Sequence, residues 1–150
     1  LFKSMAKVIE IAISENFKGK MKSIESVEIV AGQGLVGDRH FKINNHKKSQ
    51  ITLIEVENIN YYNQTSGSTI KPIDFRRNII TEGVQLNELV GREFLVGEIK
   101  LKAHDLCRPC KHLQETLEQK NLINIMMRKS GLRCEIMTSG KIFVGNEIKI

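Results

Sequence analysis

Two segments of this chain share one pattern, which constrains the fold more than any other feature of the sequence. Residues 91–101 read GREFLVGEIKL, and residues 140–150 read GKIFVGNEIKI. Each predicts a short β-strand, a glycine turn or bulge, and a second short strand. Two copies do not make a solenoid. Short strands interrupted by glycines indicate a sheet that bends sharply, as in a small β-barrel.

The remaining periodic segments also indicate a mainly β architecture. Alternation of Ile9, Ile11 and Ile13 predicts a half-buried strand with these three residues on one face. We expect strands at 7–14, 26–30, 50–54, 75–81, 99–103 and 132–137, and a closing hairpin at 140–150. Short helices are expected at about 55–62, 86–90 and 122–129, and after Pro109. The fold class is therefore mainly β, a distorted β-barrel with a few short peripheral helices.

Length and composition fit one ordinary globular domain. The chain has 150 residues, of which 41% are hydrophobic and 27% charged. We expect a single domain over residues 7–150 and an N-terminal tail over residues 1–6, in which Leu1–Ser4 resemble a cloning remnant or misplaced start before Met5. No apolar run has the length of a membrane span and no signal peptide is recognisable, so we expect a cytoplasmic location.

The basic charge of the chain favours an anion pocket over a nucleic-acid surface. The net charge is +6, but the lysines are scattered, whereas five of the seven arginines gather in or beside the candidate site segments. Guanidinium groups bind carboxylate and phosphate in bidentate fashion. Aromatic residues, which stack on exposed bases, are only 5% of the chain. We expect a small-molecule or cofactor ligand, and neither nucleic acid nor membrane as a partner.

Cys110 is the best candidate for a reactive cysteine. It lies in the segment Cys107-Arg108-Pro109-Cys110-Lys111-His112, where Pro109 fits the first position of a helix. Cationic neighbours and a helix N-terminus both stabilise thiolate over thiol. An odd number of cysteines without a secretion signal argues against a disulfide framework.

Other interpretations of the two thiols remain open. A structural zinc site would need a second ligand pair, and Cys134 stands alone. A thioredoxin-type redox pair would need a long helix after a parallel strand. Cys107 and Cys110 can also simply pack in the interior, since cysteine is often buried and inert.

Three further segments carry candidate side chains. Gly37-Asp38-Arg39-His40 follows a glycine-rich turn and is either an anion site or a surface turn. Arg76-Arg77-Asn78 lies in a predicted strand, in which successive side chains point to opposite faces, so at most one of the two arginines faces the interior. That arginine would be Arg77, which shares a face with Phe75. The alternative is that both arginines are solvated. In the predicted strand 132–137, Arg133 and Cys134 point to opposite faces, and we interpret Cys134 as a core residue.

The ordered set of these pieces resembles the MOSC domain, named for the C-terminal domain of molybdenum-cofactor sulfurases, and the chain looks like a small stand-alone member. The matching segments are 34–40 (GLVGDRH), 50–54 (QITLI), 76–79 (RRNI) with Gly83, 89–91 (LVG), 107–110 (CRPC), 131–133 (GLR) and the closing stretch 140–148. They span nearly the whole chain.

The resemblance implies a distorted β-barrel and a pocket in which Cys110 carries sulfur or ligates the molybdenum of a pterin cofactor (molybdopterin). It implies that Arg39, Arg77 and Asn78 line an anion pocket for the cofactor's phosphate or pterin. The remaining residues expected to contact the cofactor are Asp38, His40, Cys107, Arg108 and Arg133.

Larger family members sulfurate the cofactor or, with redox partners, reduce N-hydroxylated compounds. The implied activity is thus sulfurtransferase-like or that of a molybdenum-dependent reductase. The implied partners are a cysteine desulfurase, for pyridoxal phosphate-linked sulfur transfer, or a redox protein.

Because the chain departs from the family pattern in two ways, the resemblance applies to the fold more closely than to the activity. Many stand-alone relatives have further His or Gly after Asp-Arg-His, whereas this chain has Phe41-Lys42-Ile43. We also expect the protein to lack the extra N-terminal barrel domain of the larger enzymes. The alternative is a non-catalytic, anion- or metabolite-binding β-barrel module. Such a module would bind phosphate through Arg39 and Arg77, independently of the thiols.

Overall fold

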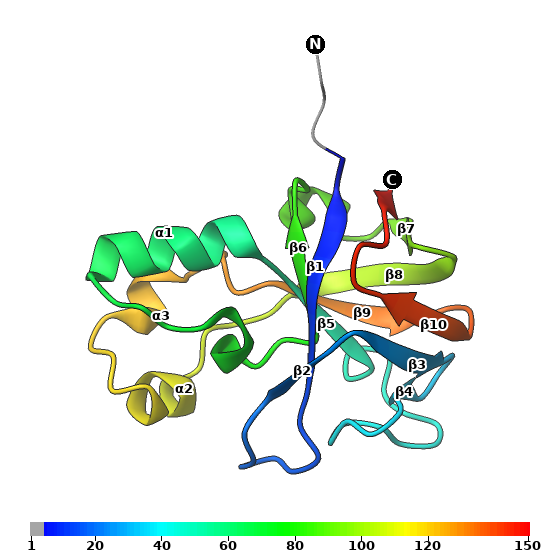
Figure 1. Ribbon diagram of the computed structural model, residues 1–150, viewed down its shortest axis with the longest axis horizontal. Helices are drawn as coiled ribbons and strands as arrows, with labels where there is room; N and C mark the ends of the chain where they lie inside the picture. The colour runs from blue at the N-terminus through cyan, green and yellow to red at the C-terminus, as the bar shows by residue number, and fades with distance from the viewer. Residues whose placement is uncertain (1–4) are drawn as a thin grey trace.

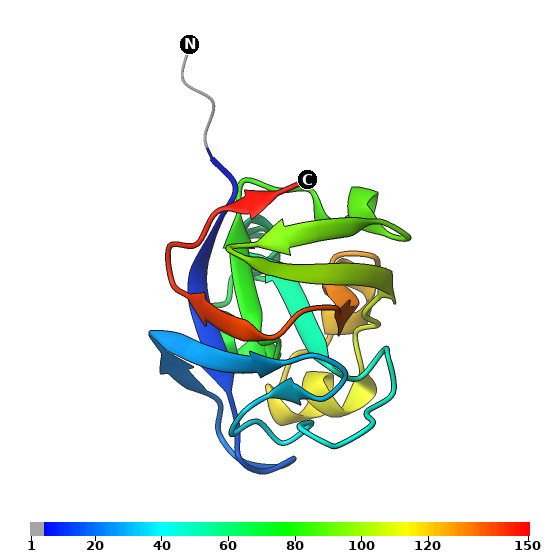
Figure 2. The ribbon, with the colours of Figure 1, turned by 90° about the vertical axis from the view of Figure 1, so that its right-hand side faces the viewer.

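Eleven strands in two sheets form a curled, barrel-like body in the computed structural model, which describes residues 5–150 (Figures 1 and 2). The first sheet has the order β11 (Ile148–Lys149), β7 (Glu93–Val96), β8 (Ile99–Leu106), β9 (Leu132–Ile136), β5 (Ile51–Glu55), β6 (Ile79–Glu82), β1 (Lys7–Ile13) and β2 (Lys22–Ile24). The second has the order β10 (Gly140–Phe143), β3 (Ser26–Val30) and β4 (Gly34–Leu35). The predicted mainly β class is confirmed. Only β5 and β6 pair in parallel among these strands.

Short helices cover one side of the first sheet, on the left in Figure 1. They are α1 (Val56–Ser66), α2 (Lys111–Thr116) and α3 (Leu122–Ile125), with the 3₁₀ turn η1 (Pro72–Phe75). A second 3₁₀ turn, η2 (Leu86–Leu89), follows β6 and buries Leu86 and Leu89 inside the barrel instead. The first helix is longer than predicted and ends where Gly67 adopts a left-handed conformation. The last is shorter, and Arg128 just beyond it has a φ of 62°. Within residues 5–150, no helix combines the length and apolarity needed to cross a bilayer.

Two hydrophobic clusters lie on opposite faces of the central strands. Leu53 and Ile79 belong to the cluster inside the barrel, whereas the next residues, Ile54 and Ile80, belong to the cluster under the helices. Strands buried on both faces read as continuous apolar runs. This arrangement explains why β5 and β6 lack a polar face.

Ile9, Ile11 and Ile13 were predicted to share one face of a strand, and this prediction is wrong for Ile9. The register of β1 against β6 shifts between Val8 and Glu10. A bulge of this kind changes which way the following side chains point. Ile11 and Ile13 therefore enter the barrel cluster, while Ile9 packs against the cluster beneath the helices.

The two similar segments adopt different pairings. Residues 91–101 include a true hairpin, in which β7 pairs with β8 around Gly97. The predicted closing hairpin does not form, because β10 pairs with β3 while β11 pairs with β7. Between them the backbone N–H of Gly145 donates to the carbonyl of Val8 at 2.8 Å. The second copy thus joins the two sheets and helps to close the barrel.

Gly131 is expected to be the most sensitive glycine. Its φ is +106°, and a Cβ atom there would lie 2.0 Å from the carbonyl oxygen of Leu53. We predict that Gly131→Ala lowers the free energy of unfolding by more than about 3 kcal/mol, because the backbone must shift as well as accept strain. Urea denaturation measures this loss.

Gly145→Ala is the matched control. Its φ of +94° is similar, but no heavy atom lies within 4 Å of the added Cβ. The expected loss is about 1 kcal/mol, from backbone strain alone. Equal losses in the two variants would contradict the close approach between Gly131 and Leu53.

Candidate functional site

The segment Arg76-Arg77-Asn78 is a turn and not the predicted strand from Phe75. The 3₁₀ turn η1 begins at Pro72 and ends at Phe75, Arg76 has a φ of 65°, and β6 begins only at Ile79. Because Arg76 adopts a left-handed conformation and the strand begins only at Ile79, the two arginines are not on opposite faces of a strand. Each reaches a different neighbouring loop.

Asn78 joins the two strands that flank β6. Its Oδ1 accepts the backbone N–H of Thr52 at 3.2 Å, and its Nδ2 donates to the carbonyl of Ala12 at 3.2 Å. Its backbone N–H donates to the Thr52 hydroxyl, and its carbonyl accepts the N–H of Ala12 at 2.7 Å. This buried amide is therefore used mainly by the fold, which leaves little of it for a ligand.

Arg76 and Arg77 hold loops in place through backbone carbonyls. Arg76 donates to the carbonyls of Gly19, at 2.7 Å, and Phe17, at 3.0 Å. Arg77 donates from Nε to the carbonyl of Ser130 at 2.8 Å and from Nη2 to that of Arg108 at 3.4 Å. Two of the five donors of Arg77 are used in these contacts, so others remain for an anion.

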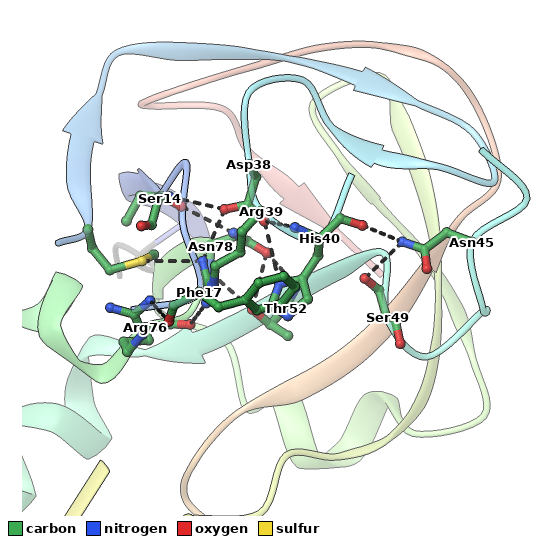
Figure 3. Close-up of polar contacts among 12 residues, drawn as sticks. Ser14, Phe17, Asp38, Arg39, His40, Asn45, Ser49, Thr52, Arg76 and Asn78 are labelled. Atoms are coloured by element: carbon green, nitrogen blue, oxygen red, sulfur yellow. Dashed lines mark hydrogen bonds and ion pairs between the residues drawn. The ribbon is translucent and has the colours of Figure 1, made fainter. Parts of the chain in front are cut away.

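Asp38 and Arg39 form a buried ion pair behind the site (Figure 3). The Arg39 Nη1 lies 3.1 Å from Asp38 Oδ1, and the two side chains are only 7% and 1% exposed. The same carboxylate oxygen accepts the N–H of Ser14 at 3.1 Å, and Arg39 Nη2 donates to the carbonyl of Arg76 at 3.3 Å. This pair thus fixes the turn that carries Arg76.

Burial and the charge of the partner shift the pKa of each residue of this pair in opposite directions. Burial alone would raise the pKa of Asp38, but contacts with His40 and Ser14 and the charge of Arg39 outweigh it, so that this pKa lies below its usual value. For Arg39 the effect of burial is the larger one, and it lowers the pKa of the guanidinium. The Asp38 carboxylate is therefore charged at neutral pH and stabilises the fold.

A cationic cavity of about 340 Å³ collects most of the predicted cofactor residues. Its lining is His40, Lys48, Ser49, Ile51, Thr52, Arg77, Asn78, Cys107, Arg108 and Arg133. We call this the first cavity. Four of its side chains carry a positive charge, and cavities of this size accept small organic ligands. The arrangement suits a phosphate-bearing molecule.

Cys110 faces an adjoining, second cavity of about 370 Å³. Its lining is Phe17, Lys18, Arg39, His40, Phe75, Arg76, Arg77, Cys110, His112, Leu113 and Thr116. His40 and Arg77 line both cavities, so they form the wall between them. The His40 ring packs edge to face against Phe17, with centroids 5.4 Å apart.

The two thiols of the Cys-Arg-Pro-Cys motif have different surroundings. Cys110 is exposed and precedes α2, and its Sγ accepts the N–H of Leu113 at 3.2 Å. The helix begins at Lys111, so Pro109 is not its first residue as predicted. Cys107 is buried in the wall of the first cavity, and burial raises the pKa of its thiol. Exposure therefore favours Cys110 as the thiol that meets an external group.

Cys134 is a core residue, as its strand pattern predicted. It is fully buried in the barrel cluster, and burial raises its pKa well above the usual value. Within residues 5–150, no three His, Cys, Asp or Glu side chains gather as a metal-binding group. The zinc alternative for Cys107 and Cys110 therefore lacks a ligand set there.

Several residues of the site were missed by the sequence reasoning. Lys48 lines the first cavity from the loop before β5, and Asp105 binds it through an ion pair of 3.3 Å. Thr52 also lines this cavity, but its sequence context is an ordinary strand. The cluster of polar residues around Lys48 was the one available signal, and it is equally typical of a solvent-exposed loop.

The structure thus groups the predicted residues into two adjoining cavities. His40, Arg77, Asn78, Cys107, Arg108 and Arg133 line the first cavity, and Arg39 and Cys110 line the second. Asp38 lines neither of them and acts through its contacts with Arg39 and His40.

Comparison with known proteins gives a consistent family and fold. A family model described as the MOSC domain matches residues 38–149. No curated protein sequence matches the chain. The fold is similar to that of the YuaD protein from Bacillus subtilis, with 19% identity, a TM-score of 0.84, and 97% of this chain and 94% of that one covered.

Two structures of YiiM are also similar. For YiiM from Geobacillus stearothermophilus the identity is 15% and the TM-score 0.75, with 96% of this chain and 74% of that one covered. For YiiM from Escherichia coli the identity is 16% and the TM-score 0.74, with 97% and 69% covered. At these identities the likeness concerns the fold.

Replacing Asp38 should destabilise the protein. We predict that Asp38→Asn lowers the free energy of unfolding at pH 7 by about 3 kcal/mol, because the buried Arg39 loses its charged partner. The pKa of Asp38 is lowered in the fold, so its contribution is present above its unfolded pKa and is lost as pH falls below about 4. Denaturant unfolding of both proteins from pH 7 to pH 3 measures this difference.

The double variant Asp38→Asn/Arg39→Met is the control. It removes both charges, and it should be more stable than Asp38→Asn because no unpaired guanidinium remains buried. A single variant as stable as the wild type at pH 7, or a difference that does not shrink in acid, would contradict a stabilising ion pair.

Proposed function

Because this chain belongs to the MOSC domain family, we propose that it handles molybdenum cofactor, binding the anionic part of the cofactor in the first cavity and using Cys110 as its functional thiol. The observation that carries this proposal is the junction of two cavities. One is lined by four cationic side chains and the other by an exposed thiol, and they share the wall formed by His40 and Arg77.

The side chains present fit such a cofactor. Lys48, Arg77, Arg108 and Arg133 suit its phosphate, because guanidinium and ammonium groups donate charge-assisted hydrogen bonds to phosphate oxygens. Cys110 supplies a soft donor, which suits molybdenum, and it is exposed toward the second cavity. The bound cofactor would supply redox chemistry at molybdenum.

The protein residues would bind and orient the ligand. Arg77 is held by the carbonyls of Ser130 and Arg108, so its remaining donors have a fixed direction toward the cavities. His40 is held from behind by Asp38, whose Oδ2 accepts the His40 backbone N–H at 3.3 Å. A wall fixed in this way lowers the entropy lost when a ligand binds.

The same thiol is suited to carrying sulfur. In this form of the proposal, the Cys110 thiolate attacks the terminal sulfur of a donor persulfide. A new S–S bond forms at Cys110, the S–S bond of the donor breaks, and the donor leaves as a thiolate. The donor class is a protein persulfide of the kind made by a pyridoxal phosphate-linked cysteine desulfurase. Reduction of N-hydroxylated compounds, the other family activity, would instead need an electron-donating partner.

Replacing Cys110 tests the proposal. We predict that Cys110→Ser, made in a host that synthesises molybdenum cofactor, lowers bound molybdenum or protein persulfide at least about tenfold, because serine supplies no soft thiolate. Elemental analysis measures the metal, and trapping with an alkylating reagent measures the persulfide. Because Cys110 is exposed, the midpoint of thermal unfolding should change little.

Cys134→Ala is the matched thiol control. Cys134 lies in the core and lines neither cavity, so this variant should keep the wild-type level of metal or persulfide even if it is somewhat less stable. Full retention of both by Cys110→Ser would refute the role of this thiol.

One observation favours a second candidate, the non-catalytic anion-binding module. Cys110 does not line the first cavity, so an anion bound there need not touch its sulfur. This candidate predicts that alkylation of Cys110 leaves the affinity for a phosphate-bearing pterin unchanged. Our proposal predicts a clear loss of affinity on alkylation, which isothermal titration calorimetry can measure.

A further inference from the structure

Asp105 is placed beside the first cavity by a β-bulge. The register of β8 against β9 pairs Ala103 with Cys134, and then shifts so that Asp105 is opposite Arg133. In a regular antiparallel ladder His104 would occupy that position. Instead, His104 Nε2 lies 2.9 Å from Glu135 on β9. The bulge therefore creates a direct cross-strand pair between Asp105 and Arg133.

The Asp105 carboxylate binds two of the four cations of the first cavity. Arg133 donates from Nε to Asp105 Oδ1 at 2.7 Å and from Nη2 to Oδ2, which makes the contact bidentate. Lys48 Nζ lies 3.3 Å from Oδ2. Hydrogen bonds from Arg133 lower the pKa of Asp105, so the carboxylate is charged at neutral pH.

The other two cations have no acidic partner. Among residues 5–150, neither Arg77 nor Arg108 has a carboxylate within ion-pair distance. The four cations thus fall into two pairs: the charge of Arg133 and Lys48 is offset by Asp105, and the charge of Arg77 and Arg108 is not. The side chains of Asp105, Arg133 and Lys48 are 33%, 40% and 38% exposed, so an entering anion can reach this group.

We propose that Asp105 is a specificity-determining counter-ion, which weakens the binding of small free anions so that the first cavity retains ligands that also engage Arg77 and Arg108. An anion that approaches Arg133 and Lys48 must share them with a fixed negative charge, and Asp105 repels it. A small anion has no other contacts to offset this repulsion. A larger phosphate-bearing ligand gains them from Arg77 and Arg108.

This inference rests on the anion-binding part of the proposed function and adds a selectivity for ligand size. It also makes the effect dependent on ligand charge. The repulsion is proportional to the charge of the anion, so a dianion is rejected more strongly than a monoanion. A residue that served only to position Arg133 would have the opposite effect, since its removal would weaken binding.

Asp105→Asn distinguishes these two roles by the sign of its effect. Sulfate is the dianionic probe and formate the monoanionic one, each titrated calorimetrically at low ionic strength into protein made in a host without molybdenum cofactor. We expect Asp105→Asn to bind sulfate about tenfold more tightly than the wild type, and to gain less for formate. The double variant Asp105→Asn/Arg133→Gln should lose this gain, because the released guanidinium is absent.

Glu135→Gln is the charge-matched control. It removes one negative charge from β9, but Glu135 pairs with His104 and does not line the first cavity. Its sulfate affinity should stay within about twofold of the wild type. Asp105→Ser is a second variant of the same position, which repeats the test with a shorter side chain.

The inference is overturned if both Asp105 variants bind sulfate no more tightly than the wild type, or if no variant binds sulfate at all. Equal gains from Asp105→Asn and Glu135→Gln would also overturn it, since they would report net charge alone. These outcomes are separate from the Cys110 test, because sulfate binding needs neither the thiol nor the cofactor.

Discussion

The Asn78 side chain joins strands β1 and β5 immediately before β6 enters between them, and both cavities depend on this contact. Its amide bonds to Ala12 on one side and Thr52 on the other, with the backbone of Asn78 adding a bond to each. A parallel β5–β6 pair has no tight turn to fix its register. The buried amide therefore helps to set where β6 begins, and with it where Arg76 and Arg77 lie.

Arginines of the site serve two different purposes. Arg39 and Arg76 are largely occupied by protein acceptors, the first by Asp38 and the second by two loop carbonyls. Arg108 and most donors of Arg77 are available to a ligand. Arg39 is buried and needs a charged partner, and Arg76 is held by two carbonyls, so these two arginines are fixed before any ligand binds. The cavity walls are thus largely preorganised.

Much of the fold could be predicted from the sequence, because its strands have clear periodicity and its turns have glycines. The predicted strand at residues 26–30 has the observed bounds, and Cys134 lies in the core as its alternation indicated. The family resemblance also grouped residues far apart in the chain. Most of them do line two adjoining cavities, although their roles toward a ligand remain predictions.

The errors have local physical causes that periodicity does not reveal. Arg76 adopts a positive φ, which is rare for a residue other than glycine, and so the strand predicted through it does not form. Bulges in β1 and β8 change the facing of Ile9 and Asp105. A bulge depends on partner strands, so the sequence of one strand gives little sign of it.

A native, non-reducing mass spectrum of the wild-type protein, purified from a host that makes molybdenum cofactor, tests the central claim most directly. The account predicts an added mass equal to a molybdopterin cofactor or to one sulfur atom, removed by treatment with a thiol reductant in the case of sulfur. The bare mass of the polypeptide, with no such addition, would contradict the claim that this protein handles molybdenum cofactor or sulfur through Cys110.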